Sequence, residues 1–263
     1  MTLIGEKPMF NLNGKVGLVV GIANDQSIAY GCARTFKMCG ADVAVTYLNE
    51  KAEKYVRPLA ELISSPIIMP LDVQHDDQLD AVFAEIDKQW GRLDFLVHSI
   101  AFAPKEDLHG RVTDCSRDGF MKAMDISCHS FARMARKAEP LMKNGGTLLT
   151  MTYLGADEVV DNYGVMGPVK AALQSVSRYL AAELGPKDIR VHAISPGPLA
   201  TRASSGIKEF DKLLQEAEDR APLHRLVSPS DVGALAAYLV SDVAKSITGG
   251  TIYIDGGYHI VGS

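Results

Sequence analysis

Apolar runs rich in valine, isoleucine and leucine alternate with helical patterns along almost the whole chain. The apolar runs show no regular alternation of polar and apolar residues, which is typical of parallel strands covered on both faces. Strands that alternate with helices favour right-handed crossovers between parallel neighbours. We therefore predict an α/β fold for residues 1–263: a single domain with a Rossmann-type, doubly wound parallel sheet of about seven strands and helices on both faces.

The predicted elements follow one another with little interruption. Strands are expected at Lys15–Ile22, Ala41–Tyr47, Ile67–Leu71, Asp94–Ile100, Gly146–Tyr153, Ile189–Ile194 and Thr251–Asp255. Helices are expected at Ser27–Cys39, Lys51–Ser64, Asp76–Trp90, Ser116–Met142, Gly164–Leu184 and Pro229–Ser241. The segment 199–226 breaks this rhythm, and it is long enough to form a loop that covers a substrate.

Composition narrows the classes of function. The 263 residues carry a formal net charge of -5 and a pI of about 5.8, so we expect no general affinity for nucleic acid. No apolar run reaches the length of a membrane span, and the first residues lack the pattern of a secretion signal. A cytoplasmic location is therefore the default expectation. The four cysteines form no CxxC pair and are expected to be reduced thiols.

The turn after the first predicted strand is typical of a nucleotide site. It begins at Gly21 and leads through Ser27 into the first helix. Small residues let the backbone approach a pyrophosphate, whose charge favours the N-terminus of the following helix. The GxGxxG pattern is absent, and an ordinary glycine turn is the alternative. Neither an acidic ribose reader nor an arginine stands at Leu48, where the second strand ends, so these residues leave NADH and NADPH open.

Two further strand ends carry candidate cofactor ligands. Asp72 and Val73 follow the third strand, where the carboxylate can accept from an adenine amino group or, alternatively, cap the next helix. The fourth strand runs from His98 into Ser99 and Ile100, and small side chains near its end let a ribose pass closely. His98 lies within the strand and is interpreted as a packed core histidine.

Tyr163 and Lys170 are seven residues apart, which is about two full turns of a helix. If one helix spans both residues, they share a face, and the lysine cation favours the phenolate and makes the tyrosine a better proton donor. A surface tyrosine and a solvated lysine are the alternative. Pro168 is tolerated only in a first helical turn or at a kink, so the helix can begin later than Gly164.

Several short motifs are more specific than the pair alone. They are Gly-x5-Ser-x-Ala-x-Gly from Gly21, His-Ser-Ile-Ala-Phe-Ala-Pro at 98–104, Tyr-Leu-Gly-Ala at 153–156, Asn-Tyr-Gly-Val-Met-Gly at 162–167, Tyr-x6-Lys from Tyr163 and Ser-Gly-Ile-Lys-Glu-Phe at 205–210. Together they resemble a divergent branch of the short-chain dehydrogenase/reductase superfamily, the bacterial enoyl-acyl-carrier-protein reductases of type II fatty acid synthesis. The resemblance extends from Gly14 to Gly257.

The resemblance implies an activity and a set of site residues. The activity is reduction of the C2=C3 double bond of a trans-2-enoyl thioester on acyl carrier protein by NAD(P)H, with NADH preferred and no metal ion. Tyr163 would donate a hydrogen bond to the thioester carbonyl, Lys170 would hold the nicotinamide ribose, and Tyr153 would lie near the substrate with Ala103. The implied cofactor contacts are Gly21, Ser27, Ile28, Leu48, Asp72, Val73, Ser99, Ile100, Lys170, Leu199, Ala200, Thr201, Arg202 and Ala203.

Two other functions stay open. One is a carbonyl or alcohol oxidoreductase of the same superfamily, although Tyr153 stands where its usual serine would be. The other is a regulator that binds NAD(P) without catalysis, although both Tyr163 and Lys170 are present.

The resemblance also implies a homotetramer. The two long predicted helices carry apolar and small residues such as Met121, Ala135 and Ala181, which would let paired helices approach closely. The C-terminal run Ile252–Val261 would provide a second interface.

Overall fold

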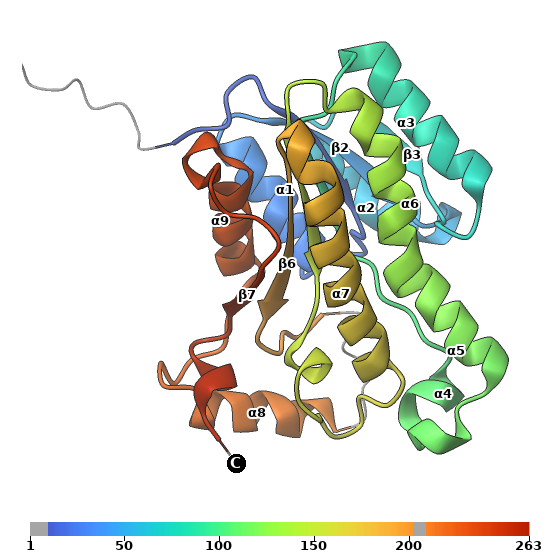
Figure 1. Cartoon of the computed structure of the whole chain (residues 1–263), viewed down its shortest axis with the longest axis vertical. Coiled ribbons are helices and arrows are strands. Elements are labelled where there is room, and N and C mark those ends of the chain that lie inside the picture. The colour runs from blue at the N-terminus through green and yellow to red at the C-terminus, as the bar shows by residue number, and fades with distance from the viewer. Residues whose placement is uncertain (1–9, 202–208, 263) are drawn as a thin grey trace, which may run out of the picture.

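The computed structural model describes residues 10–201 and 209–262, and their strands form one seven-stranded parallel sheet (Figure 1). The strand order is β3-β2-β1-β4-β5-β6-β7. The strands are β1 Val16–Val20, β2 Asp42–Tyr47, β3 Ile68–Pro70, β4 Phe95–His98, β5 Gly146–Met151, β6 Ile189–Pro196 and β7 Thr251–Ile254. The predicted doubly wound sheet and its seven strands are confirmed.

The order of the strands reverses between β1 and β4. Strands β2 and β3 extend the sheet on one side of β1, whereas β4 to β7 extend it on the other. The ends of β1 and β4 are in register, with Val20 opposite His98. The crossovers from these two strands leave in opposite directions, and open α/β sheets bind ligands in the crevice that results.

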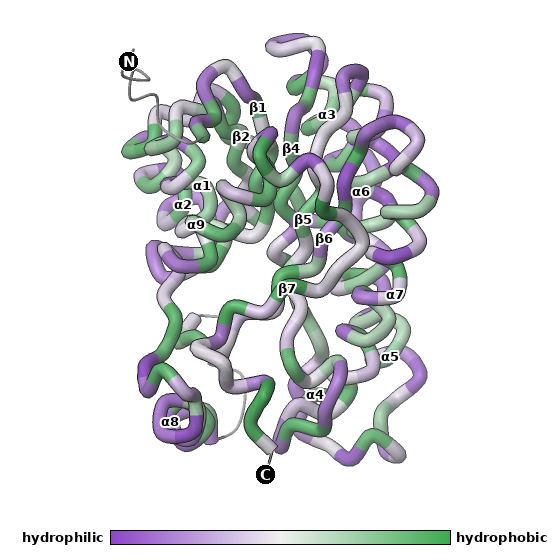
Figure 2. Tube along the Cα trace, turned by 60° about the vertical axis from the view of Figure 1, so that its left-hand side comes forward, coloured by the Kyte–Doolittle hydropathy of each residue, from purple (hydrophilic) through white to green (hydrophobic). Residues whose placement is uncertain are grey.

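Helices pack on both faces of the sheet (Figure 2). One face carries α1 Ile28–Met38, α2 Glu50–Leu62 and α9 Pro229–Val240. The other face carries α3 Asp76–Trp90, α6 Ser130–Ala138 and α7 Met166–Leu184. A cluster of buried apolar side chains fills each interface, with Phe36 in the first and Phe131 in the second. This double coverage explains why the strands carry continuous apolar runs.

The predicted helix Ser116–Met142 is helical throughout most of its length but is not one regular α-helix. It consists of α5 Arg117–Met124, a π-helical turn Asp125–His129, α6, and a 3-10 turn Glu139–Leu141. The Ser130 hydroxyl donates to the Ile126 carbonyl oxygen at 2.7 Å. Such back-bonding by serine competes with the regular helical ladder and accompanies the change in winding.

Two helices were not predicted, α4 Lys105–His109 and α8 Phe210–Arg220. The second lies within the segment expected to be a loop at 199–226. Its apolar residues Phe210, Leu213, Leu214 and Ala217 follow the spacing of an amphipathic helix, so the signal was present. No helix in the described part of the chain is long and apolar enough to cross a membrane.

Helices α1 and α9 touch backbone to backbone at a pair of glycines. A Cβ atom at Gly31 would lie 2.2 Å from the Pro229 carbonyl oxygen, and one at Gly233 would lie 2.5 Å from the Gly31 carbonyl oxygen. Both distances are far below van der Waals contact. The close approach therefore depends on the absence of side chains at these positions.

We predict that Gly31→Ala destabilises the protein by about 1–3 kcal/mol, because the added methyl group forces α1 and α9 apart. Gly185→Ala is the matched control, since nothing lies within 4 Å of its Cβ position and its φ of -53° suits alanine. Urea unfolding of the two variants measures the difference. Equal stabilities would contradict the close helix contact.

Candidate active site

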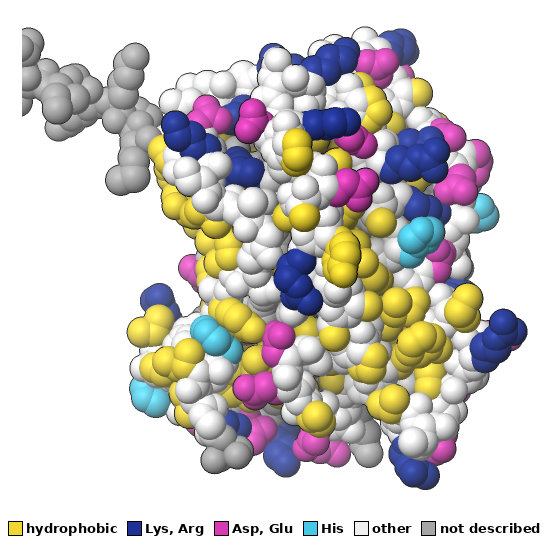
Figure 3. All heavy atoms as spheres, viewed as in Figure 1, with side chains coloured by type: hydrophobic (Ala, Val, Ile, Leu, Met, Phe, Trp, Pro, Cys, Tyr) yellow, Lys and Arg dark blue, Asp and Glu magenta, His cyan; other side chains and the backbone are white. Residues whose placement is uncertain are grey.

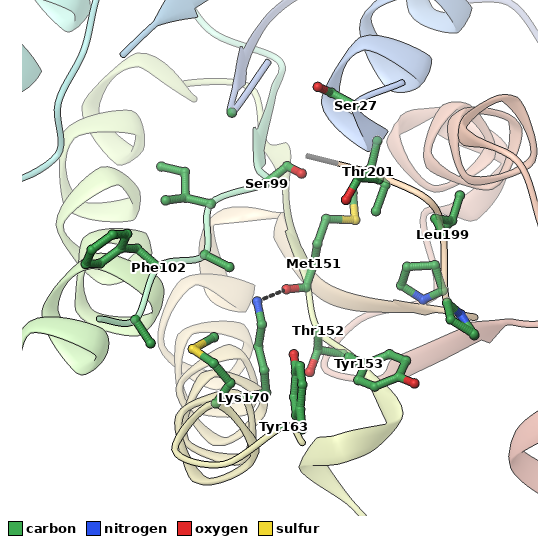
Figure 4. A pocket seen from close by; sticks show the side chains of 18 of the residues that line it. Ser27, Ser99, Phe102, Met151, Thr152, Tyr153, Tyr163, Lys170, Leu199 and Thr201 are labelled. Carbon is green, nitrogen blue, oxygen red and sulfur yellow. Dashed lines mark hydrogen bonds between the residues drawn. The ribbon is translucent and has the colours of Figure 1, made fainter. Parts of the chain in front are cut away.

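A cavity of about 480 Å³ lies at the carboxyl ends of β1, β4, β5 and β6 (Figure 4). Segments far apart in the sequence form its walls. Of the predicted site residues, those that line it are Gly21, Ser27, Ile28, Ser99, Ile100, Ala103, Tyr153, Tyr163, Lys170, Leu199 and Thr201. The fold thus brings the three predicted catalytic residues together with most of the predicted cofactor contacts.

The wall beside α1 is a tight turn. Gly21 has a φ of 111°, and a Cβ atom there would lie 2.0 Å from the Ser99 carbonyl oxygen, so only glycine fits. The Ser27 hydroxyl accepts from the amides of Ala23 and Asn24, each at 3.0 Å. It orders the turn rather than capping α1, which has no side-chain cap among the described residues. Uncapped N–H groups beside a cavity suit an anion such as a pyrophosphate.

A short loop before α7 positions Tyr163. Asn162 and Gly164 flank it with φ values of 60° and 43°, a left-handed conformation that asparagine and glycine adopt more readily than other residues. A Cβ atom at Gly164 would lie 2.3 Å from the Leu108 carbonyl oxygen, so the loop packs closely on α4. Because α7 begins only after Tyr163, this residue and Lys170 do not share a helix face. The expectation of one common helix was wrong, although both residues reach the same cavity.

Lys170 extends from the start of α7 into the cavity. It is 4% exposed, and its ammonium group donates a 2.7 Å hydrogen bond to the carbonyl oxygen of Met151 at the end of β5. Burial lowers the pKa of Lys170 from 10.5 to about 8. Pro168 lies in the first turn of α7, where proline is tolerated. An ammonium group has three N–H donors, so Lys170 keeps donors for a ligand.

The rings of Tyr153 and Tyr163 meet edge to face, with centroids 5.0 Å apart and an interplanar angle of 65°. In Figure 4 the Tyr163 hydroxyl points the same way as the Lys170 side chain, whereas the Tyr153 hydroxyl points away from it. The Tyr153 hydroxyl is buried and has no hydrogen-bond partner among the described residues.

Both phenols are weaker acids than a free tyrosine. Burial raises the pKa of Tyr163 and that of Tyr153 well above 10. The neighbouring Tyr258 and Asp255 add to the shift of Tyr153, and Tyr153 adds to that of Tyr163. The expectation that Lys170 makes Tyr163 more acidic is wrong for this structure, because desolvation of the phenolate dominates. Tyr163 is therefore a neutral hydrogen-bond donor over the physiological pH range.

Other predicted cofactor contacts lie outside this cavity. Leu48 follows β2 and is 54% exposed. Asp72 follows β3 and accepts hydrogen bonds from the backbone and side-chain amides of Gln74, at 3.0 and 3.2 Å, so it forms a local turn and does not cap α3. The Val73 carbonyl oxygen accepts from Arg133 at 2.7 Å. All three residues lie just beyond the carboxyl ends of β2 or β3, at the same end of the parallel sheet as the cavity.

Three predicted contacts near β6 remain. Ala200 is exposed and is not part of the cavity lining. Arg202 and Ala203 lie outside the described residues.

The interpretation of His98 as a core residue is confirmed. It is fully buried, with Nδ1 2.9 Å from the Thr150 hydroxyl and Nε2 2.7 Å from the Ser130 hydroxyl. Burial lowers the pKa of His98 to about 3, so the ring is neutral. It links β4, β5 and α6 beneath the cavity.

The sequence patterns assign no role to Leu108, Met151, Thr152 and Met166, which also line the cavity, whereas Phe210 was expected in the covering loop. Met151 and Thr152 end the fifth strand, and the rule that ligands bind at the carboxyl ends of strands would have found them. Phe210 begins the missed helix α8. Met166 begins α7 and carries no signal in the sequence that separates it from a core residue.

Known proteins match this chain along nearly its whole length. The family model described as enoyl-(acyl carrier protein) reductase matches residues 21–259. An enoyl-acyl-carrier-protein reductase (NADH) FabI of Synechocystis sp. is 47% identical over 257 residues, which span 97% of this chain and 100% of that relative.

Solved structures agree with the sequence matches. The reductase of Anaplasma phagocytophilum in complex with NAD is 47% identical, with a TM-score of 0.92 and 96% of each chain covered. The reductase of Bacillus cereus with NADP+ and indole naphthyridinone is 44% identical, with a TM-score of 0.94, covering 97% of this chain and 100% of that one. The chain belongs to the enoyl-(acyl carrier protein) reductase family.

We predict that Lys170→Met stabilises the fold at pH 7. The folded-state pKa of about 8 lies below the ordinary value of 10.5, so burying the charged ammonium group costs free energy at every pH below 8. Between these two values the unfolded chain binds the extra proton, and the cost disappears as the pH rises. The expected gain at pH 7 is on the order of 1–3 kcal/mol, reduced by the lost hydrogen bond to Met151.

Urea unfolding at pH 7 and at pH 10 measures this gain. The exposed Lys143→Met variant controls for the loss of one ammonium group from the protein. A gain from Lys170→Met that is equally large at both pH values would show that burial of the charge is not its cause.

Proposed function

We propose that this protein reduces the C2=C3 double bond of trans-2-enoyl thioesters on acyl carrier protein, with NADH as the hydride donor, and so completes a cycle of fatty acid elongation. The observation that carries the proposal is the meeting of Tyr163 and Lys170 in one cavity with the Gly21 turn. Relatives that are 44–47% identical over nearly the full chain carry the name of this reductase.

The residues present fit a dinucleotide. The turn at Gly21 lines the cavity with backbone, since no side chain fits beside the Ser99 carbonyl oxygen, and α1 offers uncapped N–H groups to a pyrophosphate. Relatives named as NADH reductases support NADH over NADPH. The charges after β2 do not decide between the two cofactors, because Glu50 and Glu53 alternate with Lys51 and Lys54 in the first turn of α2. Bound NADH would supply the hydride.

The side chains of the cavity have separate tasks. Tyr163, which stays protonated, donates a hydrogen bond to the thioester oxygen, where negative charge gathers as the double bond is reduced. Lys170 directs its remaining N–H donors to the ribose hydroxyls and stays fixed by Met151. Tyr153 has a buried hydroxyl without a described partner and lies against the Tyr163 ring, which suits a role beside the substrate.

The segment 199–226 is proposed to form one wall of the acyl site. Leu199, Thr201 and Phe210 line the cavity, and the last of these begins α8. Apolar cover at this place would exclude water from the reacting carbons.

A steady-state assay tests the function. A trans-2-octenoyl thioester should be reduced, with a higher kcat/KM for NADH than for NADPH. Both cofactors belong in the assay, because one Bacillus cereus relative is named for NADH and a Bacillus cereus reductase was solved with NADP+. An acetoacetyl thioester is the control for carbonyl reduction. Activity only with that control would replace the proposal, and no activity with either would favour a regulator.

We predict that Tyr163→Phe lowers kcat by about 10²–10³ and changes the affinity for NADH little, because it removes one donor to the developing negative charge. Lys170→Ala should instead weaken NADH binding, since its ammonium is assigned to the ribose. Titration of protein fluorescence with NADH, alongside steady-state rates, separates the two effects. Full kcat in Tyr163→Phe would remove this residue from the reaction.

A homotetramer is the assembly that we propose. Met121 on α5 and Tyr179 on α7 are 60% and 77% exposed, and Figure 3 shows hydrophobic side chains gathered over the face that these helices form. Ile260 is 70% exposed near the C-terminus and would serve the second interface. Ala135 and Ala181, which were expected at an interface, pack instead in the chain's own core.

Light scattering at micromolar concentration is expected to give about four times the chain mass of 28.4 kDa. A particle of a single chain mass would exclude the assembly.

The carrier-bound substrate and the reduced cysteines support a cytoplasmic location, which cell fractionation tests.

A further inference from the structure

The π-helical turn between α5 and α6 places a buried serine against the cavity wall. Ser127 lies in this turn and is fully buried. Its hydroxyl accepts from the Phe102 amide at 2.9 Å and donates to the Phe102 carbonyl oxygen at 3.0 Å. One side chain thus satisfies both backbone groups of a residue that lines the cavity.

The wall that contains Phe102 has few other attachments. Strand β4 ends at His98, and Ser99 to Ala103 continue along the cavity without a neighbouring strand. The first residue of this stretch is fixed, because the Ser99 amide donates to the Val20 carbonyl oxygen at 3.0 Å. In the part of the chain that the structure describes, Phe102 is the next residue along the wall whose backbone bonds to another element.

The two ends of the wall therefore have different anchors. The Ser99 end lies against the Gly21 turn, where the cofactor is expected, and is held by β1. The Phe102 end is held by Ser127 and leads into Ala103 and α4. The Phe102 ring itself is 43% exposed, so burial of that ring does not fix the backbone.

We propose that Ser127 is a positioning residue for the acyl end of the cavity. Its hydroxyl takes the place of a neighbouring strand and holds Phe102 and Ala103 where they contact the enoyl chain. The π-helical turn serves to aim this hydroxyl at the wall. The assignment rests on the proposed function for the identity of the ligand, whereas the anchoring of Phe102 does not depend on it.

The variant Ser127→Ala tests the Phe102 end of the wall independently of the Ser99 end. The variant is expected to raise KM for a trans-2-octenoyl thioester about tenfold, because two hydrogen bonds that order the wall are lost. It should leave kcat and the dissociation constant of NADH within about twofold, since the Ser99 end keeps its own anchor. Ser127→Thr, which retains the hydroxyl, should restore most of the lost substrate affinity.

Ser177→Ala is the matched control. Ser177 is 2% exposed, and its hydroxyl donates to the Leu173 carbonyl oxygen within α7, away from the cavity lining. Ser177→Ala removes a buried serine hydroxyl of the same kind and should leave KM for the thioester and the dissociation constant of NADH unchanged. If Ser127→Ala leaves the substrate KM unchanged, or if both variants raise it equally, the positioning role is wrong.

Hydrogen exchange in the protein without ligands gives a second readout. The Phe102 amide should exchange at least about tenfold faster in Ser127→Ala than in the wild type or in Ser177→Ala, because its acceptor is gone. Unchanged exchange would overturn the proposal. If the wild type reduces no enoyl thioester, the proposed function fails, and faster exchange of Phe102 would still establish the anchor.

Discussion

The close approach of Gly21 to Ser99 is the contact on which the site depends. Parallel strands have all their carboxyl ends at the same end of the sheet. The reversal of strand order between β1 and β4 opens a crevice there. The crevice is usable only because the turn after β1 passes within contact distance of the Ser99 carbonyl without a side chain. The Ser27 hydroxyl orders the same turn and leaves α1 uncapped beside the cavity. Ser99 begins the wall that runs to Ala103.

The sequence predicted what depends on hydrophobic pattern and on the ends of strands. All seven strands follow from their apolar runs, and Gly21, Ser99 and Leu199 line the cavity because they follow strands at its edge. The route by which Tyr163 reaches the cavity was not predicted, because it depends on the left-handed backbone of Asn162 and Gly164 and not on helical spacing. Helix α8 was missed although its amphipathic spacing is regular, since the surrounding glycines, serines and prolines favoured a loop.

Features that depend on burial were the least accessible to sequence reasoning. A lysine near a tyrosine suggests an acidic phenol, but the phenol and the ammonium group are both desolvated. The same desolvation acts in opposite directions on the two groups, raising the pKa of Tyr163 and lowering that of Lys170. The positions of Ser127 and Ser130 likewise gave no signal, because a π-helical turn changes which residues face the sheet.

These opposite shifts fix the protonation states with which the site meets its ligands. Tyr163 keeps its proton, so under the proposed function it would stabilise charge on a substrate oxygen as a hydrogen-bond donor and not as a phenolate. Lys170 keeps its charge at neutral pH. Its described hydrogen-bond partner is the Met151 carbonyl oxygen, so the ammonium group has further N–H donors for a ligand. Phosphates and ribose hydroxyls would replace part of the solvation that burial removed from the ammonium group, and bound cofactor would therefore raise the pKa of Lys170. If Lys170 contacts the cofactor as proposed, binding would offset part of this desolvation cost, and the affinity for the cofactor would depend on the charge state of Lys170.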